Sequence, residues 1–222
     1  MIIYQYLGVK KLRAIIFDFW GTLVEHGVKP SPMKQVKAII APRMSYTSFV
    51  VLFEQTLMTR SYNDLYEGFT EVLKNFGKKP SRDVLDKLVA IWNKNKLLAK
   101  PFPETMDILK KLKEKYMLGI IANTDSLSVP TVIEKYQLDK YMNKIIYSYE
   151  EGVLKSSGEL LKKIMNELGV SKNETVMIGD SIQSDIEPAK KLGVKAILVD
   201  RRNTREYEPK IMGLEEIEKI MG

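Results

Sequence analysis

The sequence has no cysteine and only one histidine, His26, among its 222 residues. Without thiols the chain has no disulfide scaffold, no zinc-thiolate site and no cysteine nucleophile. A single histidine also excludes metal sites that are built from several imidazoles. Carboxylates therefore remain the main source of reactive groups and metal ligands, and their oxygen atoms suit a hard cation such as magnesium.

Long apolar runs are absent as well. No run approaches the roughly 20 residues that a membrane-spanning helix requires. The first twelve residues also lack the basic start and the small-residue cleavage site of a signal peptide. We therefore expect a cytoplasmic protein with no membrane partner.

No segment is dominated by charge of one sign. The chain carries a net charge of +7, with 28% charged and 45% hydrophobic residues, a balance typical of soluble globular proteins. Lysine and arginine are scattered among glutamate and aspartate, which favours a solvated surface over a nucleic-acid site. We expect a small anionic molecule as the partner and no nucleic acid. No sequence pattern specifies an oligomeric state.

Short, continuous apolar runs recur along the chain and end at polar residues, as strands buried on both faces of a parallel sheet do. Strands are expected at residues 14–17, 117–122, 145–147, 175–178 and 195–199, and amphipathic helices between them at 104–116, 129–136, 158–168 and 186–192. This alternation predicts an α/β fold with a doubly wound, Rossmann-like parallel sheet. Ligands of such folds bind beyond the carboxyl ends of the strands, where Asp18, Asn123 and Asp180 are expected.

The segment 27–99 interrupts this alternation, because it contains helical patterns without a convincing buried strand. Helices are expected at residues 45–58, 63–76 and 81–98, and prolines mark both the entry and the exit. The sequence therefore predicts two modules. Residues 1–26 and 100–222 form the α/β core domain, and residues 27–99 form an inserted helical domain.

Three aspartates carry the chemical interest. Asp18 directly follows a buried strand, and burial of a carboxylate without a partner costs several kcal/mol. Asp180 ends a later strand, and Asp185 begins the next helix. Together the three carboxylates predict a magnesium site whose cation neutralises the charge of a substrate phosphate. The structural alternative is that Asp18 and Asp180 turn the chain and Asp185 caps a helix.

The residues Phe17-Asp18-Phe19-Trp20-Gly21-Thr22-Leu23 resemble the first motif of the haloacid-dehalogenase-like hydrolase superfamily. Gly179-Asp180-Ser181 with Asp185 resembles the fourth motif, Ile120 to Asn123 the second, and Lys155 the third. The helical insertion 27–99 matches the family's cap domain in its position between the first and second motifs. The resemblance implies a magnesium-dependent phosphatase that acts on a small phosphorylated metabolite.

The resemblance also implies roles for single residues. Asp18 would attack phosphorus to form an aspartyl-phosphate, and Lys155 would hold both Asp18 and a phosphoryl oxygen. Mg²⁺ would be bound by Asp18, the backbone carbonyl of Trp20, Asp180 and Asp185. Substrate would be bound at the turn after the first strand, at the end of the second motif and at the lysine, by Phe19, Trp20, Thr22, Asn123, Thr124 and Lys155.

The sequence departs from the phosphatase pattern at two reacting positions. Phosphatases of this family carry a second aspartate two residues after the nucleophile, which protonates the leaving group, whereas this chain has Trp20. General acid–base catalysis contributes roughly 100- to 10,000-fold. Ala122 replaces the family's serine or threonine in the second motif, and Thr124 lies close enough to substitute in part.

These departures keep two alternatives open. Haloacid dehalogenases have an aromatic residue at the position of Trp20, so a metal-independent 2-haloacid dehalogenase is one alternative. A phosphate-binding or regulatory protein with little turnover is the other. The complete Gly-Asp-Ser motif with Asp185 favours metal and phosphate. His26 is a candidate for the missing acid, because its ordinary pKa near 6.5 suits proton transfer; otherwise it is an exposed linker residue.

Overall fold

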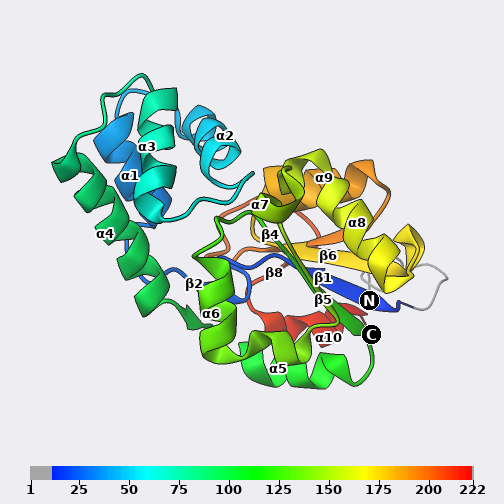
Figure 1. Ribbon diagram of the computed structural model, residues 1–222. Coiled ribbons are helices and arrows are strands. Elements are labelled where there is room, and N and C mark those ends of the chain that lie inside the picture. The colour runs from blue at the N-terminus through cyan, green and yellow to red at the C-terminus, as the bar shows by residue number, and fades with distance from the viewer. Residues whose placement is uncertain (1–11, 222) are drawn as a thin grey trace.

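A computed structural model describes residues 12–221, so residues 1–11 and 222 of the predicted core domain lie outside the described residues. Six strands form one sheet in the order β5-β4-β1-β6-β7-β8, and every neighbouring pair is parallel (Figure 1). They are β1 Ala14–Phe17, β4 Met117–Ala122, β5 Lys144–Tyr147, β6 Thr175–Gly179, β7 Lys195–Val199 and β8 Lys210–Ile211. This is the strand order of doubly wound nucleotide-binding folds, and the predicted fold class is confirmed.

Helices cover both faces of this sheet. The helices are α5 Thr105–Lys113, α6 Val129–Tyr136, α7 Ser148–Glu151, α8 Glu159–Leu168, α9 Glu187–Lys191 and α10 Ile217–Met221. Alternate side chains of β1 point to opposite faces. Ile15 and Phe17 belong to one hydrophobic cluster, and Ala14 and Ile16 belong to another, with none of the four exposed. The continuous apolar run before Asp18 therefore reflects a central strand that is buried on both faces.

The helical insertion contains four helices, one more than the sequence predicted. They are α1 Pro32–Ile40, α2 Tyr46–Leu57, α3 Leu65–Asn75 and α4 Arg82–Leu98. The missed helix is α1, because Pro32 was interpreted as a breaker, although proline fits the first turn of a helix. These helices bury a hydrophobic cluster of their own, which includes Phe49, Phe53 and Trp92. That cluster supports the predicted boundary between core and cap, which remains a prediction.

A short antiparallel pair joins the insertion to the core. The chain leaves the core through β2, Val24–Glu25, and returns through β3, Lys100–Pro101, which pairs with it. Two-residue strands carry no detectable alternation, so neither this pair nor β8 was predicted. Figure 1 shows the four helices gathered beside the sheet, with α2 on the side that faces the core. None of the helices described between residues 12 and 221 is long and apolar enough to cross a membrane.

The strand order sets the place of the site. The chain builds the sheet outward from β1 through β4 and β5, and then returns to the other side of β1 to add β6, β7 and β8. The order reverses between β1 and β6, and ligands of such sheets bind at this switch point. Asp18 follows β1 and Asp180 follows β6, so two of the predicted site residues lie there.

Candidate active site

Asp18 and Lys155 form a buried ion pair at the centre of the site. The Lys155 ammonium donates to Asp18 Oδ1, and the Thr22 hydroxyl donates to Asp18 Oδ2 at 3.0 Å. Both charged side chains are almost completely buried, with 5% of Asp18 and 4% of Lys155 exposed. The two residues are 137 positions apart in the chain, and the fold brings them together as the resemblance implied.

Asp185 is the second partner of the lysine. Its Oδ1 accepts a hydrogen bond from Lys155 Nζ at 2.7 Å, and its Oδ2 accepts one from the backbone N–H of Ser181 at 3.0 Å. Asp185 lies in a π-helical turn, Ile182–Ile186, rather than at the start of the expected α-helix. Turns of this kind are frequent at functional sites. Here the turn places the carboxylate against the end of β6.

Asp180 completes a cluster of three carboxylates. Asp18, Asp180 and Asp185 each offer an oxygen atom, and these atoms lie within 4.8 Å of one another. Gly21 makes this approach possible. Its φ of +80° favours glycine, and a Cβ atom there would lie 2.3 Å from Asp180 Oδ2. The position of the Asp180 carboxylate in the fourth motif therefore requires glycine at position 21 in the first motif.

The charges in this cluster are unbalanced. Burial, together with the charges of Asp18 and Asp185, raises the pKa of Asp180 to about 8, although Lys155 and Arg205 oppose the rise. Burial also raises the pKa of Asp185 to about 6, although Lys155 opposes the rise. Burial alone would lower the pKa of Lys155, but its two carboxylate partners hold it above its usual range. Three carboxylates thus surround one ammonium, and the Arg205 guanidinium offsets their charge only in part.

This donor set fits a magnesium ion. Mg²⁺ prefers oxygen ligands and is commonly held by one or two carboxylates together with water and substrate oxygens. The Asp18, Asp180 and Asp185 oxygens are close enough to share one cation. A dication would also relieve the excess negative charge that raises the pKa of Asp180. The three residues are therefore able to hold the predicted metal.

Two arginines that sequence reasoning missed fix the surrounding loops. Arg201 donates to the carbonyl of Gly21 at 3.2 Å and to that of Thr22 at 2.7 Å, and it pairs with Glu104 at 2.8 Å. Arg205 donates to the backbone carbonyl of Asp180. Both follow β7, and the end of the expected strand 195–199 was the available signal. They hold the first and fourth motifs at the same edge of the sheet.

The second motif has a different bonding pattern from the one predicted. The Asn123 side-chain carbonyl accepts from the backbone N–H of Lys155 at 2.9 Å, which links the second motif to the third. The Thr124 hydroxyl donates to the carbonyl of Asp125 at 2.9 Å, and its backbone N–H donates to Ser148 Oγ at 3.0 Å. Both donors of Thr124 therefore bond within the protein in this structure, and its contact with a phosphoryl group stays a prediction.

Phe19 and Trp20 lie directly after the nucleophile. The Phe19 ring is fully buried in the core, so only the backbone of this residue is able to face a substrate, and its predicted contact with substrate stays a prediction. The Trp20 ring is partly buried and stacks on the ring of His26, with 5.1 Å between centroids and 12° between planes. No proton-exchanging side chain follows the nucleophile at this position.

His26 is less exposed than a linker residue would be. Its Nδ1 atom is buried and has no hydrogen-bond partner among the described residues. Burial lowers the pKa of His26, although Asp18 and an Asn95 hydrogen bond oppose the shift. The ring is therefore mainly neutral at pH 7, which makes it a poor proton donor for a leaving group.

Glu54 was not predicted as a site residue. It belongs to α2 of the insertion, and its Oε2 accepts a hydrogen bond from Asn123 Nδ2 at 2.9 Å. The insertion makes two further contacts with the core nearby. Trp92 Nε1 donates to Asp125 Oδ2 at 2.8 Å, and Ser148 Oγ donates to the carbonyl of Met58 at 2.6 Å. The sequence held no signal for Glu54, because only the packing of α2 brings it to the second motif.

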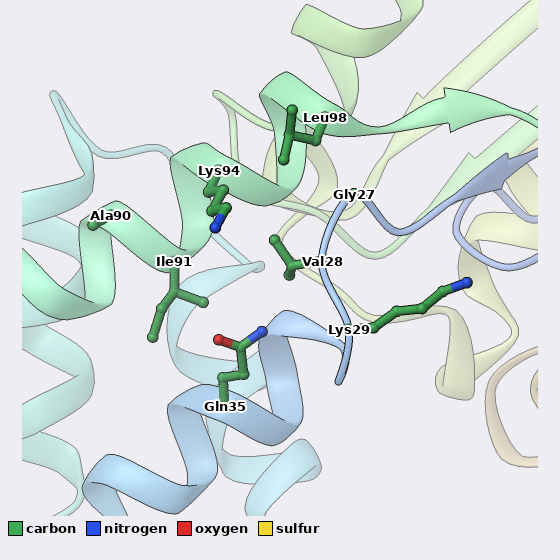
Figure 2. Close-up of a pocket in the computed structure, with 8 residues that line it drawn as sticks. All are labelled: Gly27, Val28, Lys29, Gln35, Ala90, Ile91, Lys94 and Leu98. Atoms are coloured by element: carbon green, nitrogen blue, oxygen red, sulfur yellow. The ribbon is translucent and has the colours of Figure 1, made fainter.

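The cavity drawn in Figure 2 is separate from this cluster. It has a volume of about 490 Å³ and lies between the segment that enters the insertion and helices α1 and α4. Its lining residues are Gly27, Val28, Lys29, Gln35, Ala90, Ile91, Lys94 and Leu98. None is a carboxylate or a predicted site residue. This hollow therefore lies at the root of the insertion, and the reactive groups are covered elsewhere by protein.

Comparisons with known proteins identify the family. A family model described as haloacid dehalogenase-like hydrolase matches residues 12–193. The glyceraldehyde 3-phosphate phosphatase of Pyrococcus furiosus is 27% identical over 202 residues, which cover 85% of this chain and 81% of that protein. The family model spans all four motifs, from Asp18 to Asp185.

Solved structures of similar fold include both activities that the sequence left open. A phosphatase of this family from Thermococcus onnurineus has a TM-score of 0.65 at 22% identity. A 2-haloacid dehalogenase from Pseudomonas syringae has a TM-score of 0.66 at 15% identity. Each likeness covers 95% of this chain and 98% of the other, so the fold alone does not separate the two reactions. The family match does establish the class, and the chain belongs to the haloacid dehalogenase-like hydrolases.

Proposed function

We propose that the protein is a magnesium-dependent phosphatase of small phosphorylated metabolites, with Asp18 as the covalent nucleophile. The observation that carries this proposal is the cluster of Asp18, Asp180 and Asp185 around Lys155. A phosphoryl group is anionic, so its binding beside three carboxylates requires positive charge. The name of the Pyrococcus furiosus relative supports a small phosphorylated substrate.

The reaction follows from the contacts of Asp18. One of its carboxylate oxygens attacks phosphorus, the bond from phosphorus to the leaving oxygen breaks, and an aspartyl-phosphate forms. Lys155 and Thr22 orient the attacking carboxylate, since each donates to one of its oxygens. Water then attacks the phosphorus, and the bond to Asp18 breaks. Magnesium, when held by Asp18, Asp180 and Asp185, would neutralise the charge of the phosphoryl oxygens.

We also propose that residues 27–99 act as a cap that opens to admit substrate. Asp18, Lys155 and Asp185 are each at most 5% exposed, so little of their surface is accessible to a metabolite in this structure. The insertion closes the site through the hydrogen bonds of Glu54 and Trp92. The β2–β3 pair is its connection to the core, and the hollow of Figure 2 lies beside that connection.

One observation favours a second function, metal-independent hydrolysis of a 2-haloacid. Trp20 occupies the acid–base position, and halide departure needs no proton. Asp180 opposes this function, because a dehalogenase without metal has no use for a third carboxylate beside the nucleophile. The phosphatase reaction therefore remains the better supported proposal.

One set of assays tests the proposal. Purified protein is given nitrophenyl phosphate with Mg²⁺ or with EDTA, and in parallel a 2-chloropropionate solution in which chloride release is measured. We expect phosphate release that depends on Mg²⁺ and is abolished in Asp18→Asn. Chloride release in EDTA, without phosphate release in Mg²⁺, would replace the phosphatase by the dehalogenase. Binding of phosphate with Mg²⁺ but no turnover would favour a phosphate-binding protein.

A further inference from the structure

Glu54 brings a carboxyl group from the cap to the reaction site. Its Oε2 accepts from Asn123 Nδ2, and the other end of that amide accepts from the backbone N–H of Lys155 at 2.9 Å. A single asparagine side chain therefore separates Glu54 from the lysine that binds the nucleophile. Glu54 has no role in the mechanism proposed above.

The packing of α2 fixes Glu54 in this position. Phe53 and Leu57 are fully buried in the hydrophobic cluster of the insertion. Glu54 and Met58 are four residues apart, which places them on the same face of the helix. Both bond to the core, Glu54 to Asn123 and the Met58 carbonyl to Ser148. Phe53 and Leu57 thus hold the insertion together, while Glu54 and Met58 contact the loop after β4 and the start of α7.

The surroundings of Glu54 favour proton exchange. The charged and titratable groups that face it are Lys155, Asp18 and Asp185 from the core and Tyr46 from its own helix. Burial raises the pKa of Glu54 to about 7, while Lys155 and the Asn123 hydrogen bond oppose the rise. A carboxyl group with a pKa near the working pH is well suited to general acid–base catalysis.

The two residues that the sequence offered for the acid–base position are poor proton donors. Trp20 replaces the expected acid, and its indole ring cannot exchange a proton at neutral pH. His26 stacks on that ring, and burial lowers its pKa. Asp18, Asp180 and Asp185 are the nucleophile and the two remaining metal ligands of the proposed mechanism, and both oxygens of Asp125 already accept hydrogen bonds, from Trp92, Leu127 and Ser128. Glu54 is the remaining candidate.

We propose that Glu54 protonates the leaving group and then activates the attacking water, in place of the acid that Trp20 replaces. This inference rests on the proposed phosphatase function. In the first step Asp18 bonds to phosphorus, the phosphorus–oxygen bond to the leaving group breaks, and the departing oxygen takes the proton of the Glu54 carboxyl group. In the second step water attacks phosphorus, its proton passes to the Glu54 carboxylate, and the bond to Asp18 breaks.

The location of Glu54 on the cap couples proton transfer to the closure of the cap. Because Glu54 belongs to the cap, the acid is in place only while α2 lies on the core. Closure of the cap therefore assembles the catalytic groups as well as excluding water. An open enzyme would retain Asp18, Lys155 and the metal ligands but would lack the proton donor.

The variant Glu54→Gln tests this role. Glutamine keeps the length of the side chain and an oxygen that accepts from Asn123, but it carries no exchangeable acidic proton. We measure kcat/KM for a series of phosphomonoesters from nitrophenyl to simple alkyl leaving groups. We expect a small loss for nitrophenyl phosphate and a roughly 100-fold or greater loss for alkyl phosphates. The limb of the pH profile that reports Glu54 should also disappear.

Two further variants serve as controls. Glu54→Asp keeps the carboxyl group on a shorter side chain and should restore part of the activity towards alkyl phosphates, which separates loss of the acid from loss of folding. His26→Gln should show the same leaving-group dependence as the wild type.

Each other outcome overturns the inference. An equal loss for all leaving groups in Glu54→Gln would mean that Glu54 only positions Asn123. No loss, or a steep leaving-group dependence in His26→Gln instead, would exclude Glu54 as the acid. Failure of the wild-type protein to release phosphate from any ester would overturn the proposed function itself, and the inference with it. Phosphate release that is unaffected in Glu54→Gln would overturn the inference alone.

Discussion

The pKa of Glu54 predicts that its replacement stabilises the protein at high pH. In the folded protein burial raises this pKa from 4.5 to about 7. Each pKa unit corresponds to about 1.4 kcal/mol, so the ionised carboxylate costs the folded state about 2 to 3 kcal/mol after allowance for partial exposure. Glu54→Gln removes that cost and keeps an acceptor for Asn123. Since 1 kcal/mol shifts the Tm of a chain this long by about 2–4 °C, we expect a rise of about 5–10 °C at pH 8.

The sign of the pH dependence follows from proton binding. Between pH 4.5 and about 7 the folded state holds the Glu54 proton more tightly than the unfolded state, so wild-type stability falls as the pH rises through this window. Glu54→Gln has no such group, so its stability should not fall in this pH window for this reason. Thermal unfolding without divalent cations should therefore show equal Tm values for both proteins near pH 4 and a growing difference up to pH 8. A variant that is less stable at pH 8, or a difference independent of pH, would refute the reasoning.

Three further substitutions test other parts of the site. Lys155→Met leaves buried carboxylates without their cation and should cost about 3–5 kcal/mol in unfolding measurements, whereas Lys163→Met, which removes only exposed pairs, should change little. A Lys155→Met protein as stable as the wild type would contradict the buried pairing. Asp180→Asn should raise the Mg²⁺ concentration for half-maximal phosphatase activity roughly tenfold or more. An unchanged concentration would exclude Asp180 as a metal ligand. Trp20→Asp should accelerate alkyl phosphates more than aryl phosphates and should partly rescue Glu54→Gln; equal effects on both esters would mean that position 20 does not face the leaving group.

The core of the fold could be predicted because its signals are local. Each central strand is a short apolar run that ends at a polar residue, and such runs are unambiguous when a parallel sheet buries both faces. The five predicted strands and the doubly wound order are confirmed. Two-residue strands such as β8 carry too little pattern to be recognised. The helix α1 was missed because a proline marks either a break or a first turn.

The candidate site was predictable only in part, because only some of its residues stand in patterns that are local in the sequence. Asp18, Asp180 and Asp185 stand in motifs that lie on strand ends, and the parallel sheet brings strand ends together. Glu54 reaches the site only through the packing of α2, which no short segment reveals, whereas Arg201 closely follows the expected strand 195–199. Their roles, like those of the predicted site residues, stay proposals until the variants are measured.

The most direct test of the account is to trap the phosphorylated enzyme and locate the phosphate. Protein reacting with nitrophenyl phosphate and Mg²⁺ is denatured and treated with borohydride, which reduces an aspartyl-phosphate to homoserine. Peptide mass spectrometry should find homoserine at position 18 alone, and none in Asp18→Asn. Reduction at another carboxyl group, or turnover without any trapped residue, would contradict Asp18 as the nucleophile.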